Sequence, residues 1–169
     1  FLAWDCSPFD SASPKALISN SRVKTLYKIV NNFDKPKLVL TTVNAVLQKT
    51  IPLKEVKNYG LLIRAKSKIS IEQICNFLIT AGYSRSACAN ITGEFAVRGG
   101  IVDFVCEKAS DLIGYRIDFF GDEIESIKAF DPLTQLTLEP LKEIEILPAS
   151  EVILSEKTVE RSEEHTSEL

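Results

Sequence analysis

The stretch GEFAVRGGIVDFV, residues 93–105, decides how the second half of this chain folds. Apolar side chains alternate with charged or small ones over residues 94–98, which is the period of a half-buried β-strand. Gly99-Gly100 then permits a tight turn or a bulge, and residues 101–105 resume as a more apolar strand. The pattern predicts two strands that meet at a glycine corner, with Arg98 at its lip.

The residues after the corner continue to indicate β-structure. Strand patterns recur over residues 115–120, 123–130 and 142–147. Gly121-Asp122 separates the first two of these strands, and the run DPLT at residues 131–134 is typical of a type I turn. We therefore expect an antiparallel meander.

One helix precedes these strands. Residues 70–73, SIEQ, form a capping box, in which the serine hydroxyl and the glutamine side chain satisfy free amides of the first turn. The expected buried stripe of this helix consists of Ile71, Ile74, Cys75, Leu78 and Ile79. Gly82 ends the helix as a C-cap, a strand is expected over residues 59–65, and residues 53–58 are expected to be a linker. Together these elements predict an α+β domain over residues 53–148, with an antiparallel sheet and a packed helix.

Residues 1–52 have a different pattern. Apolar residues at approximate helical spacing predict a helix over residues 16–30. The run LVL at residues 38–40 is typical of a strand buried on both faces, and a threonine just after it can cap a helix over residues 43–49. Strand, cap and helix are half of a βαβ unit, so we expect an α/β fragment, a slice of a parallel sheet that cannot close by itself.

Charge is unevenly distributed along the 169 residues. Residues 1–68 carry 12 Lys/Arg and 4 Asp/Glu, a net charge of +8, whereas residues 69–160 carry 7 and 16, a net charge of −9. A basic first half suits nucleic acid or an acidic partner, but attraction between the two halves explains the charges equally well. No apolar run approaches the roughly 18 residues of a membrane span, so we expect a soluble, cytoplasmic protein with no membrane partner.

Both ends of the chain are unusual. Methionine is absent, including at position 1, so we expect the chain to begin inside a longer protein. Residues 161–169, RSEEHTSEL, resemble the in-frame translation of a sequencing adapter and are excluded from the fold prediction. They contain His165, the only histidine, so no histidine-based triad, general base or metal site is expected.

The sequence offers little for catalysis. It contains neither GxxxxGK[ST] nor GxGxxG, the phosphate-binding signatures of nucleotide enzymes. The clustered carboxylates suit either acid–base chemistry, a divalent cation or a solvated sheet face, and their alternation with apolar residues favours the last: Asp103, Asp118, Asp122, Glu123 and Glu125. The four cysteines form no CxxC pair and are expected to be reduced. We therefore expect no catalytic residue, cofactor or metal.

Two arginines, Arg85 and Arg98, stand out in the acidic half. An arginine beside aromatic and glycine residues is a frequent anchor in protein interfaces, because its planar guanidinium pairs with carboxylates while its stem packs on rings. The alternative is a surface arginine that pairs internally with Glu94 or Asp103. Spacing alone leaves both interpretations open.

Five motifs, taken together, resemble a known family. They are GEFAVRGGIVD (93–103), YRIDFFGDEIESI (115–127), FDPLTQ (130–135), WDCSPFD (4–10) and LVLTTVNAVLQ (38–48). Over residues 1–160 the chain resembles the N-terminal UvrB-homology module of the bacterial transcription-repair coupling factors (Mfd). UvrB shares the pattern of the second half, but Gly99-Gly100 and LTTVNA at residues 40–45 favour the coupling factors.

The resemblance implies a domain organisation and a function. Residues 1–52 would be part of a degenerate helicase-like domain without a Walker motif, residues 53–148 an inserted domain that binds UvrA, and residues 149–160 a return segment. This fragment would be a non-catalytic recruitment module in nucleotide excision repair. The family's ATP-driven translocase motor, with its DNA and RNA polymerase contacts, lies in downstream domains absent from this chain. The alternative is the DNA-binding portion of a UvrB-like excision-repair protein.

The resemblance also implies the site residues. The family recognises UvrA through arginines of the inserted domain, and the matching positions here are Arg85 and Arg98, with Phe95 as a nearby apolar contact. Three residues at the edge of this surface depart from the commoner family residues: Ser84, Val105 and Cys106.

Overall fold

The computed structural model describes residues 1–6, 13–31, 38–108 and 111–151, so the adapter-like tail and most of the expected return segment lie outside the described residues. In chain order the elements are α1 (Ala16–Asn31), α2 (Val43–Leu47), α3 (Leu53–Val56), β1 (Leu61–Arg64), α4 (Ile71–Thr80), β2 (Ser84–Arg85), β3 (Glu94–Arg98), β4 (Ile101–Lys108), β5 (Asp111–Phe120), β6 (Glu123–Phe130), β7 (Thr137–Leu141) and β8 (Glu143–Ile146). Within this described part, no helix is long and apolar enough to span a bilayer.

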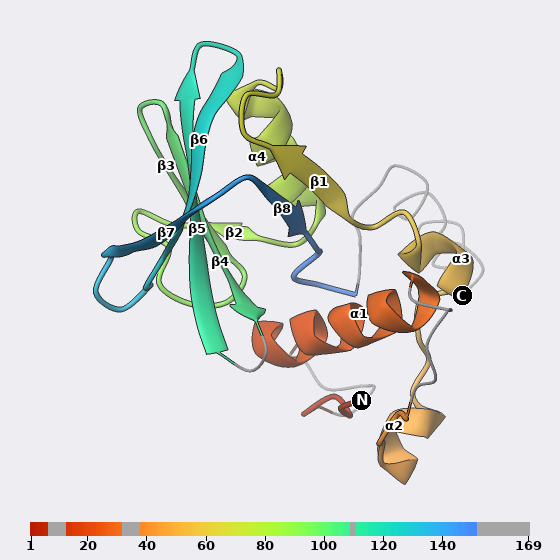
Figure 1. Ribbon diagram of the computed structural model, residues 1–169. Helices are drawn as coiled ribbons and strands as arrows, with labels where there is room; N and C mark the ends of the chain where they lie inside the picture. Colours follow the sequence, from red (N-terminus) through yellow and green to blue (C-terminus); the bar gives the residue numbers. More distant parts are fainter. Residues whose placement is uncertain (7–12, 32–37, 109–110, 152–169) are drawn as a thin grey trace, which may run out of the picture.

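A six-stranded sheet forms the body of the molecule, in the order β2-β3-β4-β5-β6-β7 (Figure 1). Neighbouring strands are antiparallel, except that β2 and β3 pair in parallel. Gly99, between β3 and β4, has a φ of +58°, a conformation that glycine adopts without steric cost. The predicted glycine corner and the antiparallel meander from β3 to β6 are therefore confirmed.

The last predicted strand belongs to a second sheet. β8 pairs with β1 in a two-stranded antiparallel sheet, in which Ile144 and Ile146 face inward and the glutamates beside them are exposed. The alternation was predicted correctly, but the sequence did not indicate which strand would be its neighbour. β7, which was not predicted, occupies the edge beside β6, and its mostly exposed residues give no alternation to detect.

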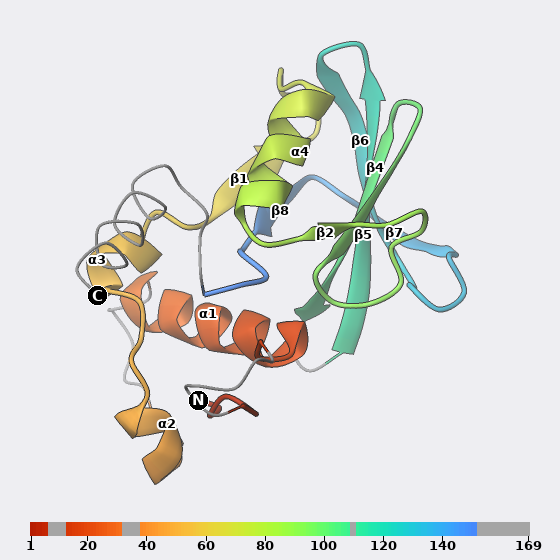
Figure 2. The ribbon, with the colours of Figure 1, turned by 180° about the vertical axis from the view of Figure 1, so that it is seen from behind.

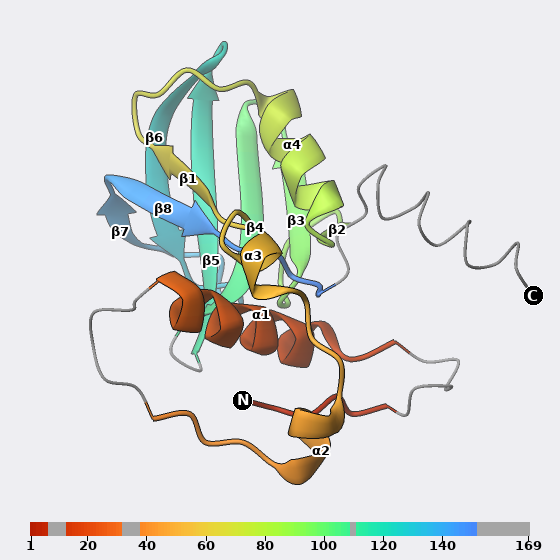
Figure 3. The ribbon, with the colours of Figure 1, turned by 90° about the vertical axis from the view of Figure 1, so that its right-hand side faces the viewer.

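The main core lies on one face of the large sheet, here called the inner face. Figure 3 shows α4 and the β1–β8 pair in front of this face, and Figure 2 shows α4 leading into β2. The largest buried side chains of this core come from α4 and five strands: Leu78, Phe95, Phe104, Ile117, Ile124 and Ile146. One helix packed on an antiparallel sheet is the expected α+β arrangement.

The capping box of α4 is confirmed. The Gln73 amide donates to the Ser70 hydroxyl at 3.2 Å, and the Ser70 amide donates to Gln73 Oε1 at 2.9 Å. Gly82, with a φ of +83°, follows the helix as predicted. The prediction that Ile79 belongs to the buried stripe is wrong, because its side chain is about half exposed. It follows Leu78 by one residue, which turns it about 100° around the helix towards solvent.

Residues 1–52 were predicted less well. The helix over residues 16–30 is confirmed as α1, and Thr42 caps α2 by accepting from the Ala45 amide. The predicted buried strand over residues 38–40 is wrong, because these residues form no strand and Leu38 is 87% exposed. No strand in the described part of the chain pairs with them, and a strand buried on both faces needs neighbouring strands. The predicted slice of a helicase-like parallel sheet is therefore not confirmed.

The predicted linker over residues 53–58 is also wrong in part, because α3 occupies Leu53–Val56. Val56 is fully buried and packs with Leu26 and Val30 of α1. The contact fixes the start of the second half against the first helix, which a flexible linker would not do.

Arg22 on α1 is fully buried and lies at the centre of a polar cluster. Its guanidinium forms an ion pair with Glu151, with the Nη2–Oε2 contact at 3.3 Å. The same guanidinium donates to the backbone carbonyl of Leu2 at 2.6 Å and to Gln48 Oε1 at 3.2 Å. Because every one of these partners comes from a different segment, one buried cation joins four parts of the chain.

Aromatic rings close over this cation. The Phe1 and Trp4 rings lie over the Arg22 guanidinium, with centroids 4.3 Å and 5.0 Å from its Cζ. Trp4 Nε1 also donates to Glu151 Oε1 at 2.9 Å. The buried guanidinium thus holds residues 1–4, α1 and the end of the described chain together, and such interactions are strongest where the charge is shielded from water.

We predict that Arg22 and Glu151 stabilise the fold as a pair. Arg22→Met or Glu151→Gln alone removes one member of a buried pair and is expected to lower the free energy of unfolding by about 3–5 kcal/mol. The double variant should lose clearly less than the sum, as measured by urea unfolding. Arg64→Met, at the exposed Arg64–Glu143 pair, is the control and should cost at most about 1 kcal/mol. Strictly additive effects would contradict the coupling.

Candidate functional site

Arg98 ends β3 at the glycine corner, on the face of the sheet opposite α4, here called the outer face. Its side chain is 52% exposed, and its Nη2 donates to Asp103 Oδ2 at 2.7 Å. The internal pairing with Asp103 that the sequence offered as one interpretation is therefore present. About half of the Arg98 side chain still faces solvent, so the pairing orients the side chain without covering it.

Asp103 is buried, which contradicts the predicted solvated face at this position. Arg116 approaches it in bidentate fashion, with Nε 2.8 Å from Oδ1 and Nη2 2.9 Å from Oδ2. With the bond from Arg98, this carboxylate accepts three charge-assisted hydrogen bonds. It lies on β4, between β3 and β5, where the two arginine side chains cover it from either side.

A second ion pair, between Asp118 and Lys128, continues the row of charged side chains that Arg98, Asp103 and Arg116 form on the outer face. Asp118 accepts from Lys128 Nζ at 2.7 Å and from the Ser126 hydroxyl at 2.5 Å. Burial raises the pKa of Asp118, but these hydrogen bonds and the charges of Lys128 and Arg116 outweigh it, so the pKa lies below 3.8. The hydrogen bonds that Arg116 donates to Asp103 raise the pKa of Arg116 above its ordinary value.

The remaining carboxylates of the predicted cluster behave as expected. Asp122 and Glu125 are exposed and Glu123 is partly exposed, in line with a solvated face. No group of three or more potential metal ligands occurs within the described residues. Four cysteines are free thiols, as predicted: Cys6, Cys75, Cys88 and Cys106.

A small apolar cluster seals the other end of the outer face. Phe130 is fully buried there with Ala89, Ala96 and Val105, and the Arg116 guanidinium lies 4.8 Å from its ring centroid. The Phe130 ring rests on Gly114, where a Cβ atom would approach ring carbons to 2.3–2.6 Å. Arg116 is therefore clamped between Asp103 and an aromatic ring.

Arg85 lies on the other face of the same sheet edge. In the register of β2 and β3 it is opposite Phe95, so both side chains are on the inner face, and Arg85 interacts electrostatically with the Cys75 thiol on α4. Arg85 is exposed, but Phe95 has no exposed surface. The predicted apolar contact thus belongs to the core and presents no side-chain surface to a partner.

Phe120 is a surface residue that the sequence interpretation missed. It is 82% exposed, next to Phe119, which packs against the inner core. The Phe119 amide donates to the Gly100 carbonyl at 2.8 Å, so the end of β5 lies beside the glycine corner. The signal was available, because adjacent residues of a strand point to opposite faces, so two neighbouring phenylalanines cannot both lie on the inner face.

Comparison with known proteins identifies the family of this fold. The family model described as the UvrB interaction domain matches residues 61–152, a range that contains β1 to β8. The chain belongs to the UvrB interaction domain family. The match covers both sheets, α4 and the outer face with its row of charges.

Three similar curated proteins carry the same name. The chain is 37% identical over 159 residues to the transcription-repair-coupling factor of Rickettsia bellii, covering 94% of this chain and 14% of that protein. It is 33% identical over 156 residues to the one from Myxococcus xanthus and 32% identical over 157 residues to the one from Escherichia coli. These cover 92% and 93% of this chain and 13% of each relative. The chain therefore spans about one seventh of the length of these relatives.

We predict that Gly114 is required by the UvrB interaction domain fold. Gly114→Ala forces a methyl group into the Phe130 ring and should lower the free energy of unfolding by about 1–3 kcal/mol in urea unfolding. Gly99→Asn is the control, because Gly99 has no heavy atom near its Cβ position and Asn tolerates a positive φ. Equal stability of Gly114→Ala and the wild type would contradict the assigned packing.

We predict that Asp118 contributes an acid-sensitive part of the stability. Its folded pKa is below 3.8, so its contribution is complete above about pH 4 and is lost as the pH falls through the lowered pKa. Asp118→Asn should be less stable than the wild type at pH 7, and the difference should shrink towards pH 3 in urea unfolding. A pH-independent difference would show that the charge of Asp118 is not what stabilises this face.

Proposed function

We propose that this chain is a non-catalytic docking module that binds UvrA in transcription-coupled nucleotide excision repair. The family match over residues 61–152 and relatives named transcription-repair-coupling factor support this function. In the longer protein, other segments supply ATP-driven translocation and contacts with DNA and RNA polymerase. The part described here supplies recruitment.

The observation that carries the proposal is the surface formed by Arg98 and Phe120, here called the corner surface. The strand register places Arg98 and Phe120 on the outer face. The glycine corner and the β5–β6 turn, next to these two residues, lie at the same end of the sheet (Figure 1). An exposed aromatic residue and an oriented arginine at the same end of one sheet face have the composition found at protein-interface hot spots. Phe120 thus takes the role of apolar contact that was expected of Phe95.

Orientation of Arg98 lowers the entropy cost of binding. Its bond to Asp103 restricts the rotamers of the side chain before any partner arrives, while about half of the side chain remains exposed. Arg116 keeps Asp103 satisfied if the Arg98 guanidinium turns towards a partner carboxylate. We infer that Arg98 is a movable donor on a rigid strand end.

We propose that Arg85 is a second residue that contacts UvrA, at the β2 edge of the sheet. It lies on the inner face, so a partner that touches both arginines has to wrap around β2. Ser84 and Arg85 form only a two-residue strand at this edge, which leaves room for such an approach. Separate variants of Arg85 and Arg98 distinguish a wrapped edge from a partner confined to the outer face.

We predict that Arg98→Gln and Phe120→Ser each weaken binding of the chain to purified UvrA about tenfold or more, measured by calorimetric titration. Gln is preferred to a glutamate at position 98, because a second carboxylate next to buried Asp103 would destabilise the fold. Arg64→Gln, on β1, is the matched control and should bind normally. Unchanged affinity in both corner variants, with thermal unfolding like the wild type, would refute the corner surface.

The same protein tests the alternative of DNA binding by residues 1–68. If it holds, the affinity for double-stranded DNA falls steeply with salt, with a slope set by the number of phosphates neutralised. Our proposal expects DNA affinity to be no stronger than that of an unrelated protein of similar charge. Salt-dependent, tight DNA binding combined with no UvrA binding would favour the alternative.

A further inference from the structure

The loop between β6 and β7 turns its polar groups inward. The Asp131 carboxylate accepts hydrogen bonds from the Leu133 amide and the Thr134 hydroxyl, both at 2.9 Å. The Gln135 amide donates to the Asp131 carbonyl at 2.7 Å, and the Asp131 amide donates to the Leu136 carbonyl at 3.0 Å. These bonds hold the loop in one conformation before any partner arrives, which lowers the entropy cost of binding.

Gln135 joins this loop to the connection between β2 and β3. Its Nε2 donates to the Pro132 carbonyl at 2.8 Å, to the Ala89 carbonyl at 3.2 Å and to Asn90 Oδ1 at 3.1 Å. The φ of Gln135 is +62°, a conformation that residues other than glycine keep only where their surroundings fix the backbone. The two loops therefore form one rigid unit.

Large apolar side chains in or beside these two loops face solvent. Leu133 is 85% exposed, and three other aliphatic side chains are more than half exposed. The four residues are here called the loop surface: Ile91, Leu133, Leu136 and Leu138. Single exposed leucines need no explanation, but four large apolar side chains on two rigidly joined loops are typical of a protein-interaction site.

The loop surface and the corner surface share one side of the large sheet. In Figures 1 and 2 the β6–β7 loop lies on the side away from α4 and the β1–β8 pair. Ala89, which Gln135 contacts, is buried with Phe130 in the apolar cluster of the outer face. Phe130 ends β6 opposite Gly114, and Phe120 lies six residues further along β5. At about 3.3 Å per residue, the loop begins about 20 Å from the corner surface.

The corner surface alone is too small for a stable complex. A standard protein interface buries about 800 Å² on each partner, roughly 30 Å across, and contains about 20–30 residues a side. Arg98 and Phe120 are two side chains at one end of a face. A partner of ordinary footprint that covers them and extends along the outer face therefore reaches the loop surface.

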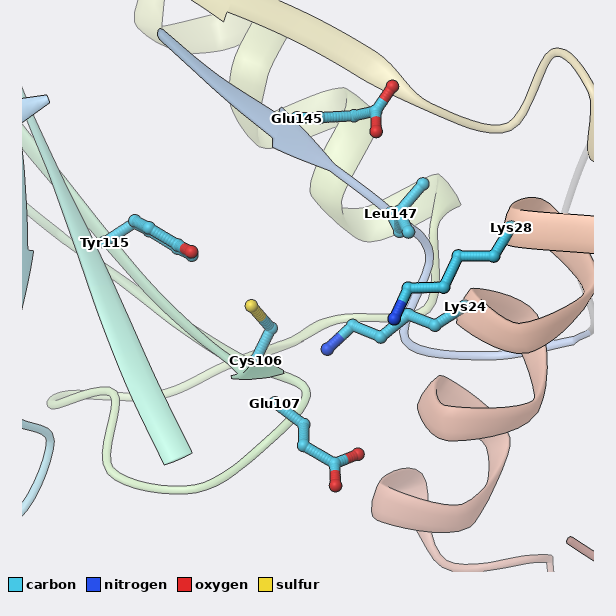
Figure 4. Close-up of a pocket in the computed structure, with 7 residues that line it drawn as sticks. All are labelled: Lys24, Lys28, Cys106, Glu107, Tyr115, Glu145 and Leu147. Carbon is cyan, nitrogen blue, oxygen red and sulfur yellow. The ribbon is translucent and has the colours of Figure 1, made fainter. Parts of the chain in front are cut away.

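The inner side of the sheet is not an equivalent direction for this footprint. α4 and the β1–β8 pair cover it, and next to α1 it has a pocket of about 190 Å³ (Figure 4). Two lysines and two glutamates line this pocket, so their charges balance: Lys24, Lys28, Glu107 and Glu145. Its volume is below the roughly 300 Å³ at which pockets for organic ligands begin.

We propose that the loop surface is a second apolar contact for UvrA, so that the UvrA footprint runs along the outer face from the corner surface to the β6–β7 loop. The inference rests on the function proposed above, because it assigns the same partner. Between the two ends, Arg116 and Lys128 are already paired with carboxylates of this chain and need few new partners from UvrA. The two ends supply the apolar contacts.

The test is a calorimetric titration of purified UvrA with the complete chain and its variants. Leu133→Ser combined with Leu136→Ser should weaken binding about fivefold or more, because two preorganised apolar contacts are lost. Leu40→Ser combined with Leu47→Ser is the matched control, since these leucines are about as exposed but lie at α2, on the far side of α1 from the sheet (Figure 3). The control should bind normally, and both double variants should unfold thermally like the wild type.

Amide hydrogen exchange of the wild-type chain gives a second readout. Addition of UvrA should slow exchange at residues 131–136 as well as at residues 98–100. Wild-type affinity of the loop variant, with weak binding by Arg98→Gln and Phe120→Ser, would overturn the loop surface and leave the proposed function intact. Equal weakening by the α2 control would also overturn it, because any exposed leucine would then count. A wild-type chain that does not bind UvrA would overturn both proposals.

Discussion

The outer face depends on one buried carboxylate. Asp103 accepts hydrogen bonds from two arginines, and each of these has a further role. Arg116 lies over the Phe130 ring, and that ring can occupy its place only because residue 114 is glycine. Arg98 reaches the surface at the glycine corner. A buried ion removed from all its partners costs several kcal/mol, so Asp103 has to keep at least its bidentate contact with Arg116. The buried contact between Asp103 and Arg116 thus makes the candidate site rigid, although Asp103 itself is not exposed to a binding partner.

A second buried charge performs the corresponding task for the other half of the chain. Arg22 connects residues 1–4, α1 and Gln48 to Glu151, and the Asn20 side chain donates to the Pro148 carbonyl at 2.9 Å. The chain therefore leaves α1, builds the α+β unit and returns to α1. In both halves one guanidinium donates hydrogen bonds to several groups at once. Its planar set of five donors allows this, whereas the ammonium group of a lysine has only three.

Local signals in the sequence predicted local structure well, and long-range signals did not. The capping box of α4 and the glycine corner depend on residues a few positions apart, and both were predicted correctly. Alternation identified which residues share a face, but it does not reveal whether that face is covered. Asp103 looked solvated because its partner Arg116 is thirteen residues away. Phe95 was expected to contact a partner only because of the family resemblance, whereas α4 and the sheets enclose it in the core. The prediction of a buried strand that includes Leu38 was wrong for the same reason, because such a strand requires neighbouring strands that the described residues do not contain.

The internal pairing of Arg98 and its proposed role in docking are compatible, although they first looked like alternatives. An exposed arginine without a partner samples many rotamers, and binding must then restrict them at a cost of about 0.5–1.5 kcal/mol for such a side chain. The hydrogen bond to Asp103 already restricts the Arg98 rotamers in the free protein, so binding has less conformational entropy left to remove. Because Arg116 contacts both oxygens of Asp103, departure of Arg98 leaves no bare buried carboxylate. The pairing is thus strong enough to orient Arg98 and weak enough to exchange for a carboxylate on a partner, which a single Arg98–Asp103 pair could not achieve.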